Sequence, residues 1–180
     1  MKNLLVVVDF QKDFVDGTLG FKKAVTLEIP LYDKINNYLK NGDKVVFTYD
    51  THSEDYLQTR EGKNLPIVHC IDGTEGHQLY GKIKEFQNVE NTFHYKKGSF
   101  GMSPEDVLRL SNELGKDIDN IEIVGIVTNM CVISNVVTFQ SQYTNVNISV
   151  DGSLCASFDD KLHEKALDVI EALQVKVTNR

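Results

Sequence analysis

Three side chains that could carry out covalent and proton-transfer chemistry stand at the ends of strand-like segments. Asp9 follows the apolar run 4–8, and Cys131 stands where a strand-like segment gives way to a helix-like one. A cysteine at a helix N-terminus could act as a nucleophile, because the free amides and partial positive charge there favour the thiolate and could also hold an oxyanion. Asp9 could then act as the base, and Lys96 or Lys97 could supply a positive charge. The alternative is structural, because a lone cysteine commonly packs in a core and a lysine commonly lies on the surface.

A second group of residues could bind a metal ion. Asp50 and His52 are two residues apart on an extended segment, so their side chains can point to the same side. Together with His69 across the following loop, they suit Zn²⁺ or another divalent ion and leave coordination positions open for a ligand. Glu61 is a candidate fourth ligand, directly or through water, and Cys70 could be a soft ligand or pack beneath the loop. An ordinary surface loop is the alternative interpretation.

Short apolar runs alternate with amphipathic stretches along the chain, which is typical of a parallel sheet covered by helices. The apolar runs predict strands at 3–8, 44–49, 91–96, 121–126, 147–150 and 175–178. Helical spacing predicts helices over 31–39, 78–85, 103–114, 131–143 and 162–173. We therefore expect an α/β fold, a Rossmann-like three-layer αβα sandwich with about six mainly parallel strands.

This fold would bring the chemically interesting residues together. Asp9 follows the first expected strand, Asp50 and His52 the second, a lysine the third, and Cys131 comes after the fourth. The carboxyl ends of parallel strands meet at one edge of the sheet, where ligands bind in such folds. We therefore expect an acid, a metal site, an amine and a thiol to share that edge.

Composition narrows the class of protein. The 180 residues carry a net charge of −7, with 41% hydrophobic and 25% charged residues, which predicts one folded domain, 1–180. The polar segment that carries the candidate metal ligands predicts a metal-binding loop insertion within it, at about 50–76. The negative charge argues against nucleic acid or an anionic membrane as partner, and no apolar run approaches the length of a membrane helix. The three widely spaced cysteines suggest no disulfide framework, so we expect a protein of the reducing cytoplasm.

Several segments resemble the motifs of a known family. Asp9–Phe14, Lys97–Gly101 and Gly125–Val132 resemble the opening, lysine and nucleophile motifs of the isochorismatase-like cysteine hydrolases. Asp50–His52 and Leu65–Cys70 are similar to the metal segment of the nicotinamidase-like branch. The resemblance runs from Lys2 to about Val177 and keeps the motif order of the family, so it implies the isochorismatase-like hydrolase fold.

The resemblance also implies a mechanism. Asp9 takes the proton of the Cys131 thiol and later hands it to the leaving amine, and Lys97 stabilises the charged pair. Lys97 is preferred to Lys96 because its distance to the following Phe-Gly pair matches the family spacing. The sulfur attacks an amide carbonyl, a thioester forms, ammonia leaves, and water releases the acid.

Further roles follow from the same resemblance. The backbone amides of Val127 and Cys131 would hold the oxyanion, and the Ile126–Val127 peptide would be cis. A metal ion on Asp50, His52, His69 and Glu61 — Zn²⁺, with Mn²⁺ or Fe²⁺ as alternatives — would bind the nitrogen of a pyridine ring, and Phe14 would pack against that ring.

The function that the resemblance implies is hydrolysis of nicotinamide to nicotinate and ammonia, within the recycling of the nicotinamide ring for NAD. Two alternatives stay open. A related cysteine hydrolase could act on another small amide, carbamoyl or ureido compound, or the same fold could serve as a catalytically silent binding module. We expect a small-molecule substrate and a homo-oligomer, a dimer or higher.

Overall fold

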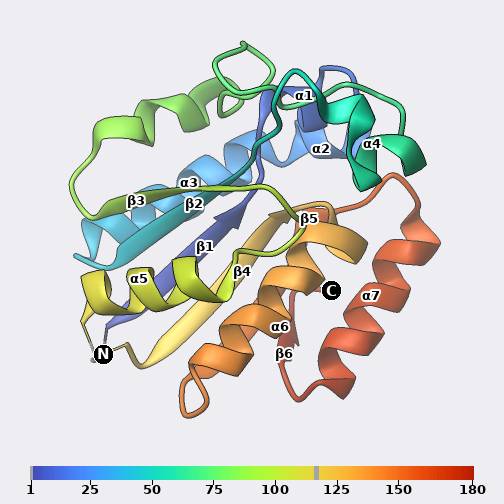
Figure 1. Ribbon diagram of the computed structural model, residues 1–180. Coiled ribbons are helices and arrows are strands. Elements are labelled where there is room, and N and C mark those ends of the chain that lie inside the picture. The colour runs from blue at the N-terminus through green and yellow to red at the C-terminus, as the bar shows by residue number, and fades with distance from the viewer. Residues whose placement is uncertain (1, 116–117) are drawn as a thin grey trace.

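A single sheet of six parallel strands organises the protein (Figure 1). The computed structural model describes residues 2–115 and 118–180. The strands are β1 (Asn3–Val8), β2 (Lys44–Asp50), β3 (Thr92–Lys97), β4 (Asn120–Ile126), β5 (Asn147–Ala156) and β6 (Lys176–Thr178). Their order across the sheet is β3-β2-β1-β4-β5-β6, and every neighbouring pair is parallel. The α/β fold expected from the sequence is confirmed.

Helices cover both faces of the sheet. They are α1 (Lys12–Val15), α2 (Lys22–Thr26), α3 (Glu28–Lys40), α4 (Arg60–Asn64), α5 (Pro104–Leu114), α6 (Ile133–Gln142) and α7 (Asp160–Ala172), with 3₁₀ turns η1 (Tyr56–Gln58) and η2 (Gly81–Asn88) and a π-helical turn η3 (Thr128–Val132). Strand β1 shows why two cores form, because successive side chains of a strand point to opposite faces. Leu4, Val6 and Val8 join the core under α5, α6 and α7, whereas Leu5 and Val7 join the core under α3 and η2.

The direction in which successive strands are added to the sheet reverses beside β1, which makes this position a topological switch point. The chain builds outward from β1 through β2 to β3, and then returns to place β4 on the other side of β1. Ligands bind at such a switch point in open α/β sheets, just beyond the carboxyl ends of the strands. Here β1 leads directly into Asp9, and β4 leads into η3, which contains Cys131.

Several elements differ from the sequence-based expectation, and the short helices α1, α2 and α4 were not predicted. Strand β5 continues to Ala156, although Asp151-Gly152 has the composition of a turn. The register between β4 and β5 shifts between Ile123 and Gly125, and the extra residues of β5 form a bulge there that lets the strand continue. The segment 81–88 forms 3₁₀ turns rather than the expected helix. Helix α6 begins at Ile133, and Cys131 lies in the preceding π-helical turn.

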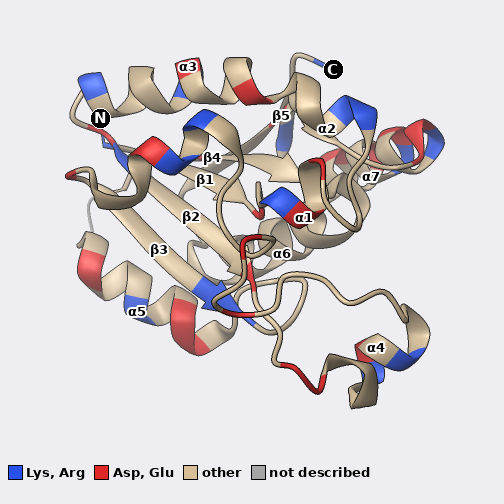
Figure 2. Ribbon diagram, turned by 90° about the horizontal axis from the view of Figure 1, so that it is seen from above, with Lys and Arg blue, Asp and Glu red and all other residues tan. Residues whose placement is uncertain are grey.

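Figure 2 shows α4 standing beyond the end of the sheet, on the long segment between β2 and β3. Lysine, arginine and acidic residues are interspersed over the helices in that view. Within residues 2–115 and 118–180, no helix is both long and apolar enough to cross a membrane.

Candidate active site

Asp9, Lys97 and Cys131 come together at the edge of the sheet. Lys97 Nζ lies 2.6 Å from Asp9 Oδ2 and 3.8 Å from Cys131 Sγ. The same ammonium donates to the Ser99 carbonyl at 2.9 Å. Asp9, Lys97 and Cys131 are all buried, with exposed fractions of 0%, 4% and 5%. The ammonium is therefore held between a carboxylate and a thiol in a site that largely excludes water.

Burial decides how these groups titrate. It raises the pKa of the Cys131 thiol well above its ordinary value, and the nearby Lys97 ammonium only partly opposes this. Cys131 lies in the π-helical turn that precedes α6, and this direction of the pKa shift favours the thiol, whereas the sequence analysis considered a thiolate favoured by a helix N-terminus. Burial also raises the pKa of Asp9, again against the effect of Lys97. Burial lowers the pKa of Lys97, but the nearby Asp9 and Asp50 carboxylates outweigh burial and raise the pKa above its ordinary value.

The expected metal ligands form one compact cluster. Asp50 Oδ2 lies 2.9 Å from His52 Nε2 and 3.3 Å from His69 Nε2, and Glu61 Oε1 lies 3.8 and 4.0 Å from the same two nitrogens. Four ligand atoms, one from each residue, lie within 4.8 Å of one another. The His69 ring nitrogen Nδ1 pairs with the Ile67 carbonyl at 2.7 Å, which directs Nε2 into the cluster.

The segment after β2 positions Glu61 beside the other residues of this cluster. Tyr56 is fully buried, and its ring packs against the His52 ring in a tilted arrangement and against the His69 ring edge-on, with 4.5 and 4.9 Å between centroids. Its hydroxyl donates to the Leu65 carbonyl. The Thr59 hydroxyl caps α4 by accepting from the Gly62 amide. Gly62 has no room for a side chain, because a Cβ there would lie 2.0 Å from the Tyr56 carbonyl oxygen. This tight turn places Glu61 beside the histidines.

Two positioning residues were missed by the sequence analysis. The buried Gln11 amide donates to the Asp50 carbonyl at 2.9 Å and accepts from the Asp50 backbone amide at 2.8 Å. The Thr48 hydroxyl donates to Asp9 Oδ1 at 2.6 Å. Thr48 lies two residues before Asp50 on strand β2, so its side chain is on the same side of an extended segment as that acid, which is the signal that could have identified it, whereas the contacts of Gln11 depend on the fold.

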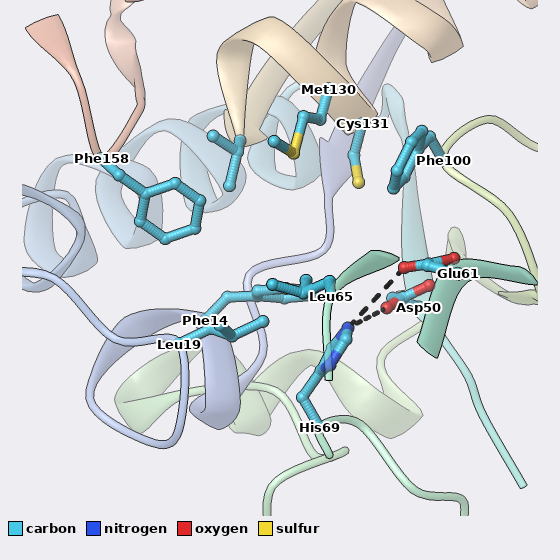
Figure 3. Close-up of a pocket in the computed structure, with 11 residues that line it drawn as sticks. Phe14, Leu19, Asp50, Glu61, Leu65, His69, Phe100, Met130, Cys131 and Phe158 are labelled. Atoms are coloured by element: carbon cyan, nitrogen blue, oxygen red, sulfur yellow. Dashed lines mark ion pairs between the residues drawn. The ribbon is translucent and has the colours of Figure 1, made fainter. Parts of the chain in front are cut away.

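A cavity of about 300 Å³ joins the two groups (Figure 3). Cys131 reaches into it from one wall, and Asp50, Glu61 and His69 face it from the opposite wall. Most of the remaining lining is apolar: Phe14, Leu19, Leu65, Phe100, Val127, Met130 and Phe158. The Phe14 ring lies 5.4 Å from the His69 ring, so the expected ring-packing residue does border the space beside the metal cluster.

The structure also resolves choices that the residues alone left open. Lys96 points away from the cavity and pairs with the exposed Asp72 at 2.7 Å, so Lys97 is the lysine of the site. Cys70 is buried and does not belong to the described metal-ligand cluster. The Ile126–Val127 peptide is cis, as expected.

Comparison with known proteins agrees with this arrangement. The model of the isochorismatase domain matches residues 3–180. An uncharacterized isochorismatase family protein of Bacillus subtilis is 28% identical over 174 residues, 93% of each chain. The nicotinamidase/pyrazinamidase of Mycobacterium tuberculosis is 27% identical over 142 residues, 71% of this chain and 73% of its own.

Solved structures lead to the same family. The crystal structure of a nicotinamidase/pyrazinamidase from Bacillus subtilis superimposes with a TM-score of 0.88 at 26% identity, covering 99% of this chain and all of the other. A Pyrococcus horikoshii pyrazinamidase in complex with zinc, 18% identical, shares the fold with a TM-score of 0.84 over the full length of both chains. The chain belongs to the isochorismatase family of hydrolases and is related to nicotinamidases.

Proposed function

We propose that this protein hydrolyses nicotinamide to nicotinate and ammonia through a thioester on Cys131. The observation that carries the proposal is the placement of the Cys131 sulfur beside the Asp9–Lys97 pair, in an apolar cavity whose other wall is a buried metal-ligand cluster. The nicotinamidases among the similar proteins support the choice of substrate.

Proton transfer is the task of Asp9. Its ionised carboxylate accepts the thiol proton as the Cys131 sulfur attacks the amide carbonyl, and the adjacent Lys97 ammonium stabilises the negative charge that passes between the two groups. The backbone amides of Val127 and Cys131 hold the oxyanion of the tetrahedral intermediate. Asp9 then returns the proton to the amide nitrogen, and ammonia leaves.

The second half of the reaction releases the acid. The carbonyl carbon is now bonded to Cys131 as a thioester, and Asp9 is again a carboxylate. Asp9 can therefore accept a proton from a water molecule while the oxygen of that water attacks the thioester carbon. The carbon–sulfur bond breaks, Cys131 regains its proton, and one amide and one water have become one carboxylic acid and one ammonia.

The residues of the second wall fit a metal ion. His52 Nε2 is buried without a hydrogen-bond partner among the described residues, and it lies beside two carboxylates and a second imidazole. This donor set suits Zn²⁺, with Mn²⁺ or Fe²⁺ as alternatives. A bound ion would offer a Lewis-acidic coordination position for the ring nitrogen of the substrate. The chain itself contributes Asp50, His52, Glu61 and His69 as ligands and Phe14 as a packing surface for the ring.

The cavity chemistry favours a small neutral aromatic amide. None of the described residues that line it is lysine or arginine, and two of them are the acids Asp50 and Glu61. A ureido or carbamoyl compound that carries a free carboxylate would find no lysine or arginine in the described lining, and Lys97 is already paired with Asp9. A flat uncharged ring can instead lie among the apolar side chains.

A substrate comparison tests the proposal. Protein loaded with Zn²⁺ is incubated with nicotinamide and, separately, with N-carbamoylglycine, and both ammonia and the organic product are quantified. The proposal predicts equal amounts of nicotinate and ammonia from nicotinamide and no ammonia from the ureido acid. The reverse preference, or turnover of neither compound by metal-loaded protein, would overturn the assignment of nicotinamide.

A further inference from the structure

Asn135 connects two walls of the cavity through its side-chain amide. It lies on α6, one turn after Cys131, and is fully buried. Its Nδ2 donates to the Cys131 carbonyl at 2.8 Å and to the Phe100 carbonyl at 3.3 Å, and its Oδ1 accepts from the Met102 amide at 3.1 Å. One side chain thus ties the backbone of the nucleophile to a segment on the other side of the site.

That segment, 98–102, contributes to the site in two ways. The Ser99 carbonyl accepts from Lys97 Nζ, and the Phe100 ring lines the cavity near Cys131 (Figure 3). The segment also packs closely on α6, because a Cβ on Gly101 would lie 3.1 Å from the Ser134 carbonyl oxygen and from Thr138 Oγ1. A shift of 98–102 relative to α6 would therefore move a lysine partner and a cavity wall together.

The three partners explain why a carboxamide is needed at this position. Two of them are acceptors and one is a donor, and Asn supplies two N–H donors and a carbonyl acceptor on a short side chain. A carboxylate in its place would face two carbonyl oxygens, and a hydroxyl could donate only once. A role in filling the core alone would require none of these polar groups, because an apolar side chain of the same shape packs as well.

We propose that Asn135 is a positioning residue, which fixes the Lys97–Phe100 side of the site relative to the Cys131 sulfur. The inference rests on the proposed hydrolysis for its kinetic consequences. Asn135 acts through the backbone of Cys131, Phe100 and Met102. Its loss would therefore loosen both the substrate wall and the alignment of the reacting groups, and small misplacements of reacting groups can cost about 10²-fold in rate.

Two variants disturb this connection, one at Asn135 itself and one in the 98–102 segment that Asn135 contacts. Asn135→Leu keeps the approximate shape and removes all three hydrogen bonds. Gly101→Ala leaves Asn135 intact but places a methyl group 3.1 Å from the Ser134 carbonyl oxygen and from Thr138 Oγ1, so the contact between the 98–102 segment and α6 must shift by a few tenths of an ångström. Thr138→Val is the matched control on the same helix, because its hydroxyl donates only to the Ser134 carbonyl of α6 itself. All proteins are studied with metal bound, at a temperature where circular dichroism shows them folded.

Two readouts separate positioning from a merely structural role. For the first, kcat and KM for nicotinamide are measured. We expect kcat/KM to fall about 10²-fold in both test variants, with KM raised as well as kcat lowered, and to stay unchanged in Thr138→Val. Lower thermal stability with unchanged kcat and KM in Asn135→Leu would overturn the proposal.

The second readout needs no turnover. Alkylation of Cys131 by iodoacetamide, followed by peptide mass spectrometry, should be several-fold faster in both test variants than in the wild type, because the Phe100 wall no longer covers the sulfur. Equal alkylation rates in all four proteins would overturn the positioning role. Absence of turnover in the wild type contradicts the proposed hydrolysis, whereas the alkylation comparison tests Asn135 independently.

Discussion

At the scale of single residues, Lys97 is the centre of the site. Its ammonium is buried, lies 2.6 Å from Asp9, and is within 3.7 Å of Asp50 and 3.8 Å of Cys131. A buried charge is tolerated only when it is paired, so Asp9 and Lys97 stabilise each other and act as one unit. The negative charge that develops during thiol attack stays within reach of this cation.

Substituting the two neighbouring lysines should separate their roles. Lys97→Met leaves the buried Asp9 carboxylate unpaired, so we expect stability to fall by about 3–5 kcal/mol and kcat/KM by at least about 10²-fold. Lys96→Met, the matched control, breaks only an exposed ion pair with Asp72, which contributes about 0–1 kcal/mol. Urea unfolding and steady-state kinetics measure both effects. Comparable losses in the two variants would contradict the assignment.

The pH dependence of the reaction should report Asp9. Burial raises the pKa of Asp9 above its ordinary value of 3.8, and Lys97 and the Thr48 hydroxyl oppose this. Only the ionised carboxylate accepts the thiol proton, so kcat/KM should rise with pH around a midpoint above 3.8. By linkage, the stability gained from protonated Asp9 is present below pH 3.8 and is lost as pH rises through the folded-state pKa. At a pH where the reaction has the ionised Asp9 carboxylate that it requires, the protein therefore lacks this contribution to its free energy of unfolding.

Thr48→Val sharpens this test. It removes the hydroxyl that donates to Asp9 Oδ1 while keeping the shape of the side chain. The pKa of Asp9 should rise further, and the acid limb of the rate profile should move to higher pH. An acid limb that stays in place would show that another group controls it.

Much of the site was predictable from residue types, but its supporting side chains were not. Asp9, Cys131 and the metal ligands carry their chemistry in their side chains and stand at strand ends or in one loop. Gln11 hydrogen-bonds the backbone of Asp50, 39 residues away in the sequence. Asn135 hydrogen-bonds the backbone of Phe100, 35 residues away. Which backbone groups lie beside an amide is decided by the fold, so no local spacing reveals their roles.

At the scale of elements, the starts of the strands were more predictable than the turns between elements. Each core strand begins near the predicted residue because a run of Leu, Val and Ile is buried on both faces. Helix α5 likewise begins and ends as predicted, because Ser103 caps it and Pro104 occupies its first turn. The π-helical turn before α6 has no comparable signal. This turn, η3, packs against α7 and β4, which are contacts that the composition of the segment does not reveal.

We expect the short helix α4 to affect chiefly the binding of the metal ion, through Glu61. Glu61→Gln removes one negative ligand from the cluster, so we expect Zn²⁺ affinity to fall, by about 10–100-fold if Glu61 matters as much as supporting groups in other metal sites. Glu54→Gln, an exposed acid in the same segment, is the matched control and should bind Zn²⁺ as the wild type does. Competition with a chromophoric chelator measures the affinities. Equal affinities for wild type and Glu61→Gln would contradict a ligand role.

At the scale of the whole molecule, the scaffold and the site are separable. The two cores lie on opposite faces of the sheet, whereas the chemistry is confined to its carboxyl edge. A partly buried cluster far from the cavity lining illustrates the separation: Lys34 of α3 pairs with Glu122 of β4 at 2.8 Å and with Asp151 of β5 at 2.7 Å. This cation joins a covering helix to two strands.

Breaking that cluster should lower stability without changing catalysis. We expect Lys34→Met to reduce the free energy of unfolding by about 1.5–3 kcal/mol, the range for hydrogen bonds to charged groups, with kcat and KM unchanged. Lys23→Met breaks an ion pair whose side chains are 46% and 82% exposed, so its effect should stay below about 1 kcal/mol. Urea denaturation compares the two. A loss of activity in folded Lys34→Met would show that scaffold and site are coupled.

The central claim is that Cys131 carries the reaction, and one comparison tests it most directly. Nicotinate formation from nicotinamide is measured for the Zn²⁺-loaded wild type, Cys131→Ala and Cys155→Ala, the last being a buried cysteine of β5 outside the described cavity lining. We predict that Cys131→Ala makes no nicotinate while remaining folded, and that Cys155→Ala retains activity. Nicotinate formation by Cys131→Ala at the wild-type rate would contradict the thioester mechanism.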